Sequence, residues 1–187
     1  MTRSPRTRLA LAAAVVIAVA SALVVALLIG GRDTGPEDPH GHGDGEFGVL
    51  GPQPEGADPA TAARGGLKAT FSWQPATDVS SGQGLVRAKP WLAGQMLADA
   101  SVPVTGSAVR PPAEWESWRA AGDIVTALVN IDGSSAPERG ECLVTATVTQ
   151  MVQHTDGTST RWRVLKIAAS MTSTEHGWRL ANYRVTG

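Results

Sequence analysis

The sequence predicts an α+β domain, with helices packed on a curved antiparallel sheet of about four strands, behind an N-terminal transmembrane helix. Three observations lead to this prediction. Residues 9–29 form an uncharged apolar run, residues 59–100 have helical patterning, and residues 123–185 alternate apolar and polar side chains between turn signals. A chain of 187 residues has room for one such domain and its appendages.

The first predicted element is the run LALAAAVVIAVASALVVALLI at residues 9–29, which contains no charge. It is long enough to cross roughly 30 Å of hydrocarbon as a helix. A cleaved signal peptide is the alternative, with Ala18–Ala20 as the cleavage site, but the apolar run continues past that site. Three arginines in residues 1–8 predict a cytoplasmic basic tail, so the protein would be single-pass in the cell membrane with its C-terminal domain extracytoplasmic.

The second segment, residues 30–59, is rich in Gly, Pro and acids and is interpreted as a disordered linker. Its His40 and His42 lie among acidic residues, which is the composition of a metal-binding stretch. A Gly-spaced linker provides neither preorganised ligands nor groups that orient them, so no metal site is expected there. The folded extracytoplasmic domain is predicted at residues 60–187.

The domain begins with helical patterning after Asp58, which can act as the N-cap with Pro59 in the first helical position. Gly65 and Gly66 weaken the middle of this helix. A second helical region is predicted at residues 78–100, with Asp78, Ser80 or Ser81 as its cap and a break at Pro90. The stretch FSWQPATD at residues 71–78 joins the two, and we interpret it as a structural corner rather than a binding segment.

The second half of the domain is predicted to be a sheet. Residues 123–132 form one strand, and residues 141–171 form a hairpin with Asp156-Gly157 as a two-residue turn. This turn sets a register in which one face is entirely apolar. The predicted pairs on that face are Val148 with Leu165, Ala146 with Ile167, and Val144 with Ala169.

The last strand follows a three-residue loop at residues 175–177, with Gly177 in the left-handed conformation. The predicted register pairs Met171 with Ala181, Ala169 with Tyr183, and Ile167 with Val185. Cys142 is in phase with Val144 and is therefore expected on the core face as a small buried residue. It is the only cysteine, which excludes an intramolecular disulfide.

Four side chains are candidate partner contacts. Trp115 and Trp118 lie three residues apart, so they share one face on a helix and lie on opposite faces of a strand. Packing in the core is one interpretation, and an exposed aromatic anchor for a partner is the other. Met151 and Trp162 are expected to face each other across the hairpin, on the face opposite the core, beside a surface rich in Thr and Ser.

No catalytic, cofactor-binding or metal-binding residue is predicted. His154 and His176 fall at hairpin tips, and Asp78, Asp99 and Asp123 flank helices or strands, where capping explains them. The sequence contains no nucleophile elbow and no dinucleotide-binding loop. The net charge is −1, and no Lys/Arg-rich run indicates a nucleic-acid partner.

Taken together, FSWQPATD, the following GLVRAKPWL and the closing GWRLANYRV at residues 177–185 resemble two related groups. These are the Mce-associated membrane proteins of actinobacteria and the VirB-eight-like proteins of type IV secretion and conjugation. The resemblance implies a nuclear-transport-factor-2-like cone and a non-enzymatic scaffold or assembly protein of an envelope, secretion or conjugative-transfer complex. Its partners would be the lipid bilayer, other proteins of the complex and further copies of itself. The alternative is a small-molecule-binding or isomerase-like domain that uses the interior of the cone.

Overall fold

The computed structural model describes residues 53–104 and 110–187, which form short helices followed by four strands. The helical elements are α2 (Pro59–Phe71), α3 (Gln83–Arg87), the 3-10 helix η1 (Lys89–Trp91), α4 (Gly94–Ser101) and α5 (Trp115–Ala121). The strands β1 (Ile124–Ser134), β2 (Glu141–Gln153), β3 (Ser159–Thr174) and β4 (Gly177–Val185) pair antiparallel in the order β1-β2-β3-β4. The predicted α+β class with a four-stranded antiparallel sheet is confirmed.

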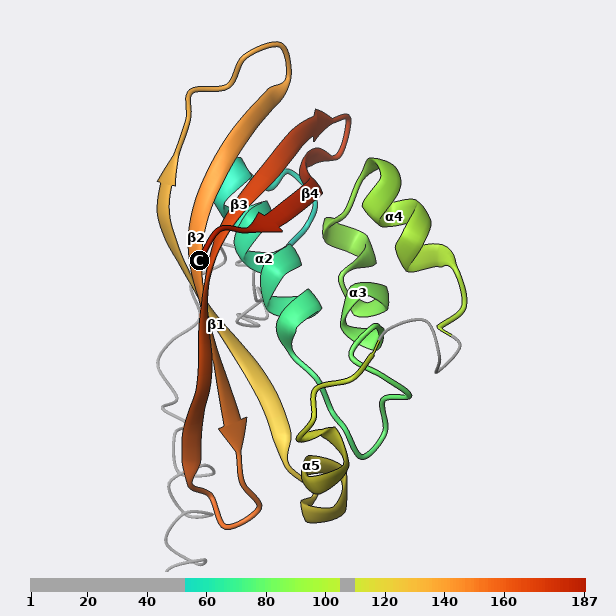
Figure 1. The fold of residues 1–187 in the computed structure, drawn as a ribbon. Helices are drawn as coiled ribbons and strands as arrows, with labels where there is room; N and C mark the ends of the chain where they lie inside the picture. Colours follow the sequence, from blue (N-terminus) through green and yellow to red (C-terminus); the bar gives the residue numbers. More distant parts are fainter. Residues whose placement is uncertain (1–52, 105–109) are drawn as a thin grey trace, which may run out of the picture. The chain divides into compact units, whose positions relative to one another are not determined.

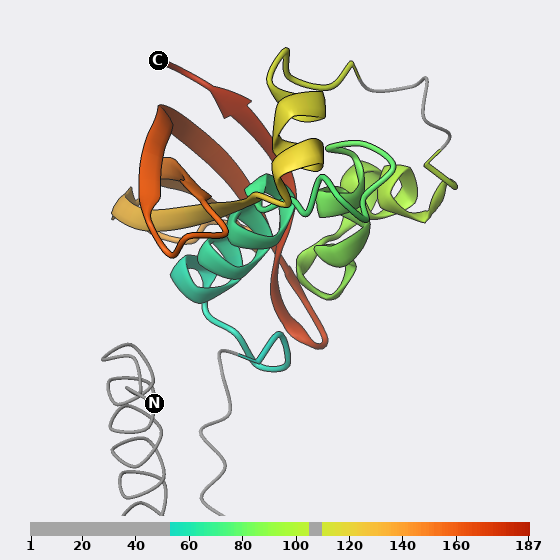
Figure 2. The ribbon, with the colours of Figure 1, turned by 90° about the horizontal axis from the view of Figure 1, so that it is seen from below.

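The helices gather on one face of a strongly curved sheet, and α5 lies at the end of the sheet where β1 begins (Figure 1). In the turned view α2 crosses this face, with α3 and α4 beyond it (Figure 2). Apolar side chains at alternate strand positions point toward the helices and form the core, as the alternation predicted. These buried strand residues include Val125, Ala127, Val144, Ala146, Val148, Ile167, Ala169 and Met171.

The start of α2 follows the prediction. Asp58 is the N-cap: its carboxylate accepts hydrogen bonds from the Thr61 backbone N–H (2.9 Å) and hydroxyl (2.8 Å), and Pro59 occupies the first turn. The glycines within α2 have a packing role. A Cβ on Gly65 would come within 2.5 Å of the Trp91 ring, so the missing side chain lets the indole lie against the helix.

The second helical region is divided into α3, η1 and α4, and Pro90 lies in the 3-10 helix between the two α-helices. Asp78 does not cap a helix, contrary to one of the predicted options. Its carboxylate accepts the Gln74 N–H at 2.7 Å and forms a two-pronged ion pair with Arg87, at 2.6 and 2.9 Å. It therefore ties the corner after α2 to α3.

The hairpin of β2 and β3 has the predicted register over most of its length, including Val148–Leu165, Ala146–Ile167 and Val144–Ala169. The two-residue turn is wrong. His154 accepts from Gly157 and donates to Thr158, so the loop is three residues long, with Gly157 at φ 85°. A bulge at Trp162 takes up the extra residue, because Gln150 pairs with Arg163 while Met151 pairs with Arg161.

The hairpin of β3 and β4 deviates in the same way. Ala169–Tyr183 and Ile167–Val185 pair as predicted, whereas Met171 pairs with Leu180 instead of Ala181. The strands continue to Thr174–Gly177, so the connection is one residue shorter than predicted and a bulge at Ala181 compensates. In both hairpins the buried apolar face restores the register beyond the turn.

The corner FSWQPATD is structural, as expected. Trp73 and Val125 exchange two backbone hydrogen bonds, at 2.8 and 2.9 Å, which joins the end of α2 to the start of β1. Both aromatic side chains of the corner, Phe71 and Trp73, are buried. The Trp73 indole N–H donates to the Thr70 carbonyl at 3.1 Å, so its polar atom is satisfied inside the domain.

The folded region begins before residue 60, where the sequence placed the boundary. Residues 54–57 lie along β4: Trp178 donates to Ala57 at 2.9 Å, and Arg179 donates to the Pro54 carbonyl at 2.8 Å. The predicted basic tail, the span at residues 9–29 and most of the linker, including His40 and His42, lie outside the described residues. Within the described ranges, no helix is long and apolar enough to span a membrane.

Candidate functional site

Three of the four predicted contact residues meet in one aromatic cluster on the helix-covered face of the sheet. The ring centroids of Trp118 and Trp162 are 4.9 Å apart with the rings nearly perpendicular. Trp73 lies 5.9 Å from Trp162 and 6.0 Å from Trp115. We call Trp73, Trp115, Trp118 and Trp162 the tryptophan cluster. Such edge-to-face pairs stabilise a core beyond their buried area, by about 0.5–1.5 kcal/mol each.

Three different local structures bring these side chains together. Trp115 and Trp118 lie on the helix α5, so their spacing of three places both on its inner face, with 1% and 6% exposure. The bulge turns Trp162 toward the helices, because the extra residue breaks the alternation of β3. Arg119 fixes α5 to the corner by donating to the Pro75 carbonyl at 2.9 Å.

The candidate contact residues do not all lie where the sequence predicted. Burial rules out an exposed anchor at Trp115 and Trp118 in this chain, and the core interpretation holds for both. Trp162 does not face Met151 across the outer surface, because Met151 pairs with Arg161 and Trp162 packs against the core. Met151 stays on the outer face of the sheet.

A buried polar group lies beside the tryptophan cluster. Gln150 is fully buried on β2; its amide donates to the Phe71 carbonyl at 2.7 Å and accepts from Arg163 Nε at 2.6 Å. The Arg163 guanidinium stacks 4.2 Å from the Trp162 ring centroid and 5.8 Å from that of Trp73. Burial lowers the pKa of Arg163, and the Glu114 carboxylate opposes this shift.

Two further polar groups lie in this interior region, the Tyr183 hydroxyl and the Trp115 indole N–H. Burial raises the pKa of Tyr183, and the positive charge of Arg163 offsets part of that shift. The indole N–H of Trp115 is buried without an acceptor among the described residues. A buried donor of this kind is costly when unpaired, so it marks a place where a small hydrogen-bond acceptor would be stabilised.

The structure places the histidines and acids that the sequence analysis considered at separate positions of the domain, apart from His154 and Asp123. His154 contacts the buried Asp123 carboxylate at 3.1 Å and the Thr160 hydroxyl at 2.9 Å, which holds the hairpin tip to the start of β1. His176 is exposed at its hairpin tip, as predicted. Asp99 is exposed and accepts from Gln95 on the same helix. The described part of the chain contains no group of three His, Cys, Asp or Glu residues placed to hold a metal ion.

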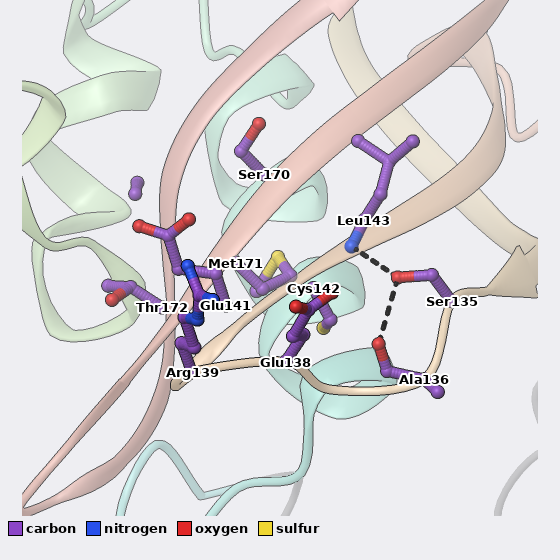
Figure 3. Close-up of a pocket in the computed structure, with 11 residues that line it drawn as sticks. Ser135, Ala136, Glu138, Arg139, Glu141, Cys142, Leu143, Ser170, Met171 and Thr172 are labelled. Atoms are coloured by element: carbon purple, nitrogen blue, oxygen red, sulfur yellow. Dashed lines mark hydrogen bonds between the residues drawn. The ribbon is translucent and has the colours of Figure 1, made fainter.

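An open polar cavity of about 780 Å³ is lined by the β1–β2 connection and the neighbouring ends of β2 and β3 (Figure 3). Glu138, Arg139 and Glu141 line it, together with the sulfur-containing side chains of Cys142 and Met171. Burial raises the pKa of the Cys142 thiol, so the thiolate that reacts with electrophiles is disfavoured. Cys142 itself is 8% exposed and packs in the core cluster, as the sequence predicted.

A second open region borders α2. Arg64 and Lys68 form a cationic ridge on this helix, with a depression on each side. One depression, of about 420 Å³, reaches the Trp91 side chain. The other, of about 310 Å³, reaches residues 127–130 of β1. No local signal in the sequence identifies this region, because the two charges of the helix lie beside a strand more than fifty residues later in the chain.

No family model matches the sequence, and no curated protein matches it. Several solved structures match it, among them the following two. The intermembrane space region of the chloroplast protein ARC6 is 17% identical with a TM-score of 0.37, covering 70% of this chain and 98% of that chain. The VirB8 protein of Agrobacterium tumefaciens is 8% identical with a TM-score of 0.38, covering 68% of this chain and 88% of that chain. Function is therefore derived from this chain's own residues.

Proposed function

We propose that this protein is a non-enzymatic scaffold of an envelope, secretion or conjugative-transfer complex, anchored in the membrane by residues 9–29, with its domain on the extracytoplasmic side. The finer assignment to the Mce-associated or VirB-eight-like groups, with a nuclear-transport-factor-2-like cone, is part of this proposal. One observation carries it: the tryptophan cluster, Arg163 and Gln150 occupy the helix-covered face of the sheet, where an interior ligand would bind.

Because these side chains fill the interior, contacts with a partner would use the surface of the domain. The Gln150 side-chain oxygen accepts from Arg163 Nε, and each of the four indole rings packs against at least one other. A cone whose interior is packed in this way acts through its outer faces and edges. The uncharged run at residues 9–29 supports a membrane anchor, and the basic residues before it support a cytoplasmic N-terminus.

The experiment is chemical crosslinking in intact cells that carry the tagged full chain, followed by identification of the crosslinked proteins. A chain lacking residues 1–29 is the control. We expect membrane or envelope proteins to be crosslinked to the full chain and to be lost with the shortened one. A full chain that yields no crosslinked protein would contradict the scaffold function. A reporter fused at Gly187 that is active only in the cytoplasm would contradict the topology.

A second candidate function is small-molecule binding in the interior. The unpaired indole N–H of Trp115 favours it, because a ligand with an acceptor atom would satisfy that donor. Native mass spectrometry of the full chain purified from its membranes distinguishes the two functions. A stoichiometric small molecule that is lost in a Trp115→Phe variant would support the second function, and the free chain mass would support the first.

A further inference from the structure

We propose that the free edge of β1 accepts an extended strand from a partner protein, with acidic side chains directed to Arg64 and Lys68. β1 is at the edge of the sheet, because the strand order is β1-β2-β3-β4. The proposal deepens the scaffold function and rests on it, since the added strand comes from a partner. Strand addition of this type uses main-chain hydrogen bonds for affinity and side-chain contacts for specificity.

The two edges of the sheet differ. The first half of β4 is covered on its outer side: Ala57 accepts from Trp178, and Ala93 donates to the Leu180 carbonyl at 3.0 Å. Among residues 53–104 and 110–187, those that pair with the outer side of β1 reach only its beginning. Trp73 pairs with Val125, and the Ser72 hydroxyl accepts from the Ala127 N–H at 3.0 Å.

The alternation of antiparallel pairing identifies which groups remain open. Val125 directs its N–H and C=O away from β2, toward Trp73, and the Ala127 N–H also points outward. The same orientation therefore recurs at Val129 and Ile131. No hydrogen bond found among the described residues reaches these two from outside the sheet. They form a row of unused backbone donors and acceptors.

Between its covered start and Asp132, this edge lacks the charges and prolines that usually prevent pairing. Natural edge strands carry charges, proline or a covering segment. Residues 124–131, IVTALVNI, contain no charge and no proline. The Leu128 side chain is 56% exposed beside the open groups. The first irregularity in the pairing comes only after Ile131. The open edge is therefore a favourable template for another strand.

The cationic ridge of Arg64 and Lys68 indicates which charge the partner strand should carry. Arg64 and Lys68 line the depression that reaches residues 127–130, and both are exposed on α2. None of the ion pairs found in the described part of the chain involves either of them. A strand paired with β1 would place the side chains opposite Val129 and Ile131 on the face that carries the ridge. Acidic residues at these positions, alternating with apolar ones that lie beside Leu128, match the site.

A second copy of this chain does not fit the same edge. Pairing two β1 edges would bring two pairs of Arg64 and Lys68 together, and like charges across an interface oppose association. The occupant is therefore an acidic strand from a different protein.

The test uses a labelled peptide with the sequence Thr-Glu-Val-Glu-Val-Glu-Thr and the full chain in detergent micelles, followed by fluorescence anisotropy. We expect saturable binding that weakens as salt increases. The variant Arg64→Glu/Lys68→Glu should weaken binding at least about tenfold. Arg184→Glu, at an exposed arginine on β4, is the matched control and should bind as the parent does. Replacing Glu by Lys in the peptide should abolish binding.

Two further measurements separate strand addition from general charge attraction. A peptide with N-methyl groups on the amides that face β1 should not bind, whereas methyl groups on the opposite amides should be tolerated. Hydrogen exchange at the amides of Val129 and Ile131 should slow when the peptide binds, while that of Leu128, which faces β2, is already slow. Equal binding of both methylated peptides would overturn the proposal.

The other occupants give different results. Slow exchange of Val129 and Ile131 that depends on chain concentration without peptide would assign the edge to a second copy. Peptide binding that appears only after the acids of residues 33–46 are replaced by Asn and Gln would assign it to this chain's own N-terminal part. Either result overturns the proposal. Crosslinked partners without peptide binding would leave the scaffold function standing and remove only this inference.

Discussion

Gln150 joins α2 to β3 from the interior of the sheet, and its replacement by Leu offers a sharp test of that connection. Gln150→Leu removes the donor to the Phe71 carbonyl and the acceptor of Arg163 Nε. A buried group left unpaired costs about 1–3 kcal/mol. The half-buried Arg163 can recover part of its loss from water, so we expect a destabilisation of about 2.5 kcal/mol in total.

A double-mutant cycle measures the coupling free energy between Gln150 and Arg163. Arg163→Leu should cost about 2 kcal/mol, from the unpaired Gln150 oxygen and the lost stacking on Trp73 and Trp162. The double variant should also cost about 2.5 kcal/mol, because the shared Gln150–Arg163 hydrogen bond is lost only once and leaves neither partner unpaired. The coupling between the two positions is therefore about 2 kcal/mol.

The assay is urea unfolding of the compact unit at residues 48–187, followed by the near-ultraviolet circular dichroism of the tryptophan cluster. Gln95→Leu, at an exposed glutamine on α4, is the matched control and should change the free energy of unfolding by less than about 0.5 kcal/mol. Costs that add without coupling, to within about 0.5 kcal/mol, would refute the reasoning, because the two side chains would then act independently.

Three further outcomes are expected. Gly65→Ala should destabilise the domain by about 1–3 kcal/mol, because the new Cβ meets the Trp91 ring, although alanine has the better helix propensity. In a Trp91→Ala background the same change should be neutral or stabilising. An equal cost in both backgrounds would contradict this explanation. The hydrogen bonds from Thr61 hold the pKa of Asp58 below its ordinary value of 3.8, so its contribution is present above about pH 4 and is lost as pH falls through the folded pKa. Asp58→Asn should therefore flatten the fall of unfolding free energy on acidification, and an unchanged slope would exclude the cap. Because burial raises its pKa, the Cys142 thiol should react with a disulfide reagent at pH 8 only slowly until urea unfolds the domain, and immediate labelling of the folded chain would contradict its burial.

Sequence reasoning located most of the sheet correctly because period-two alternation is a local property of an extended backbone. It recognised the first strand at residues 123–132 and found the central register of both hairpins. It failed at the turns. A loop longer or shorter by one residue is offset by a bulge elsewhere in the strand, and burial of the apolar face hides the exchange from any local pattern.

The candidate residues show the same limit. Trp115 and Trp118 could be identified as a pair, but their environment depended on whether residues 115–121 form a helix. Trp162 was assigned to the wrong face because the bulge that turns it inward is not visible in the sequence. Gln150 was not singled out, since a glutamine in a strand gains its meaning only from the Phe71 carbonyl, 79 residues earlier in the chain.

The sequence by itself determined two helical regions followed by four strands, the cap at Asp58, the corner at residues 71–78 and the apolar face of the sheet, but not the helix α5. Each of these depends on backbone preferences or side-chain periodicity within a few residues. Only the tertiary structure decided that the tryptophan cluster fills the interior and that Arg64 and Lys68 border the open edge of β1. Those arrangements join residues far apart in the chain, and they form because the apolar faces of α2, α5 and the sheet are buried together.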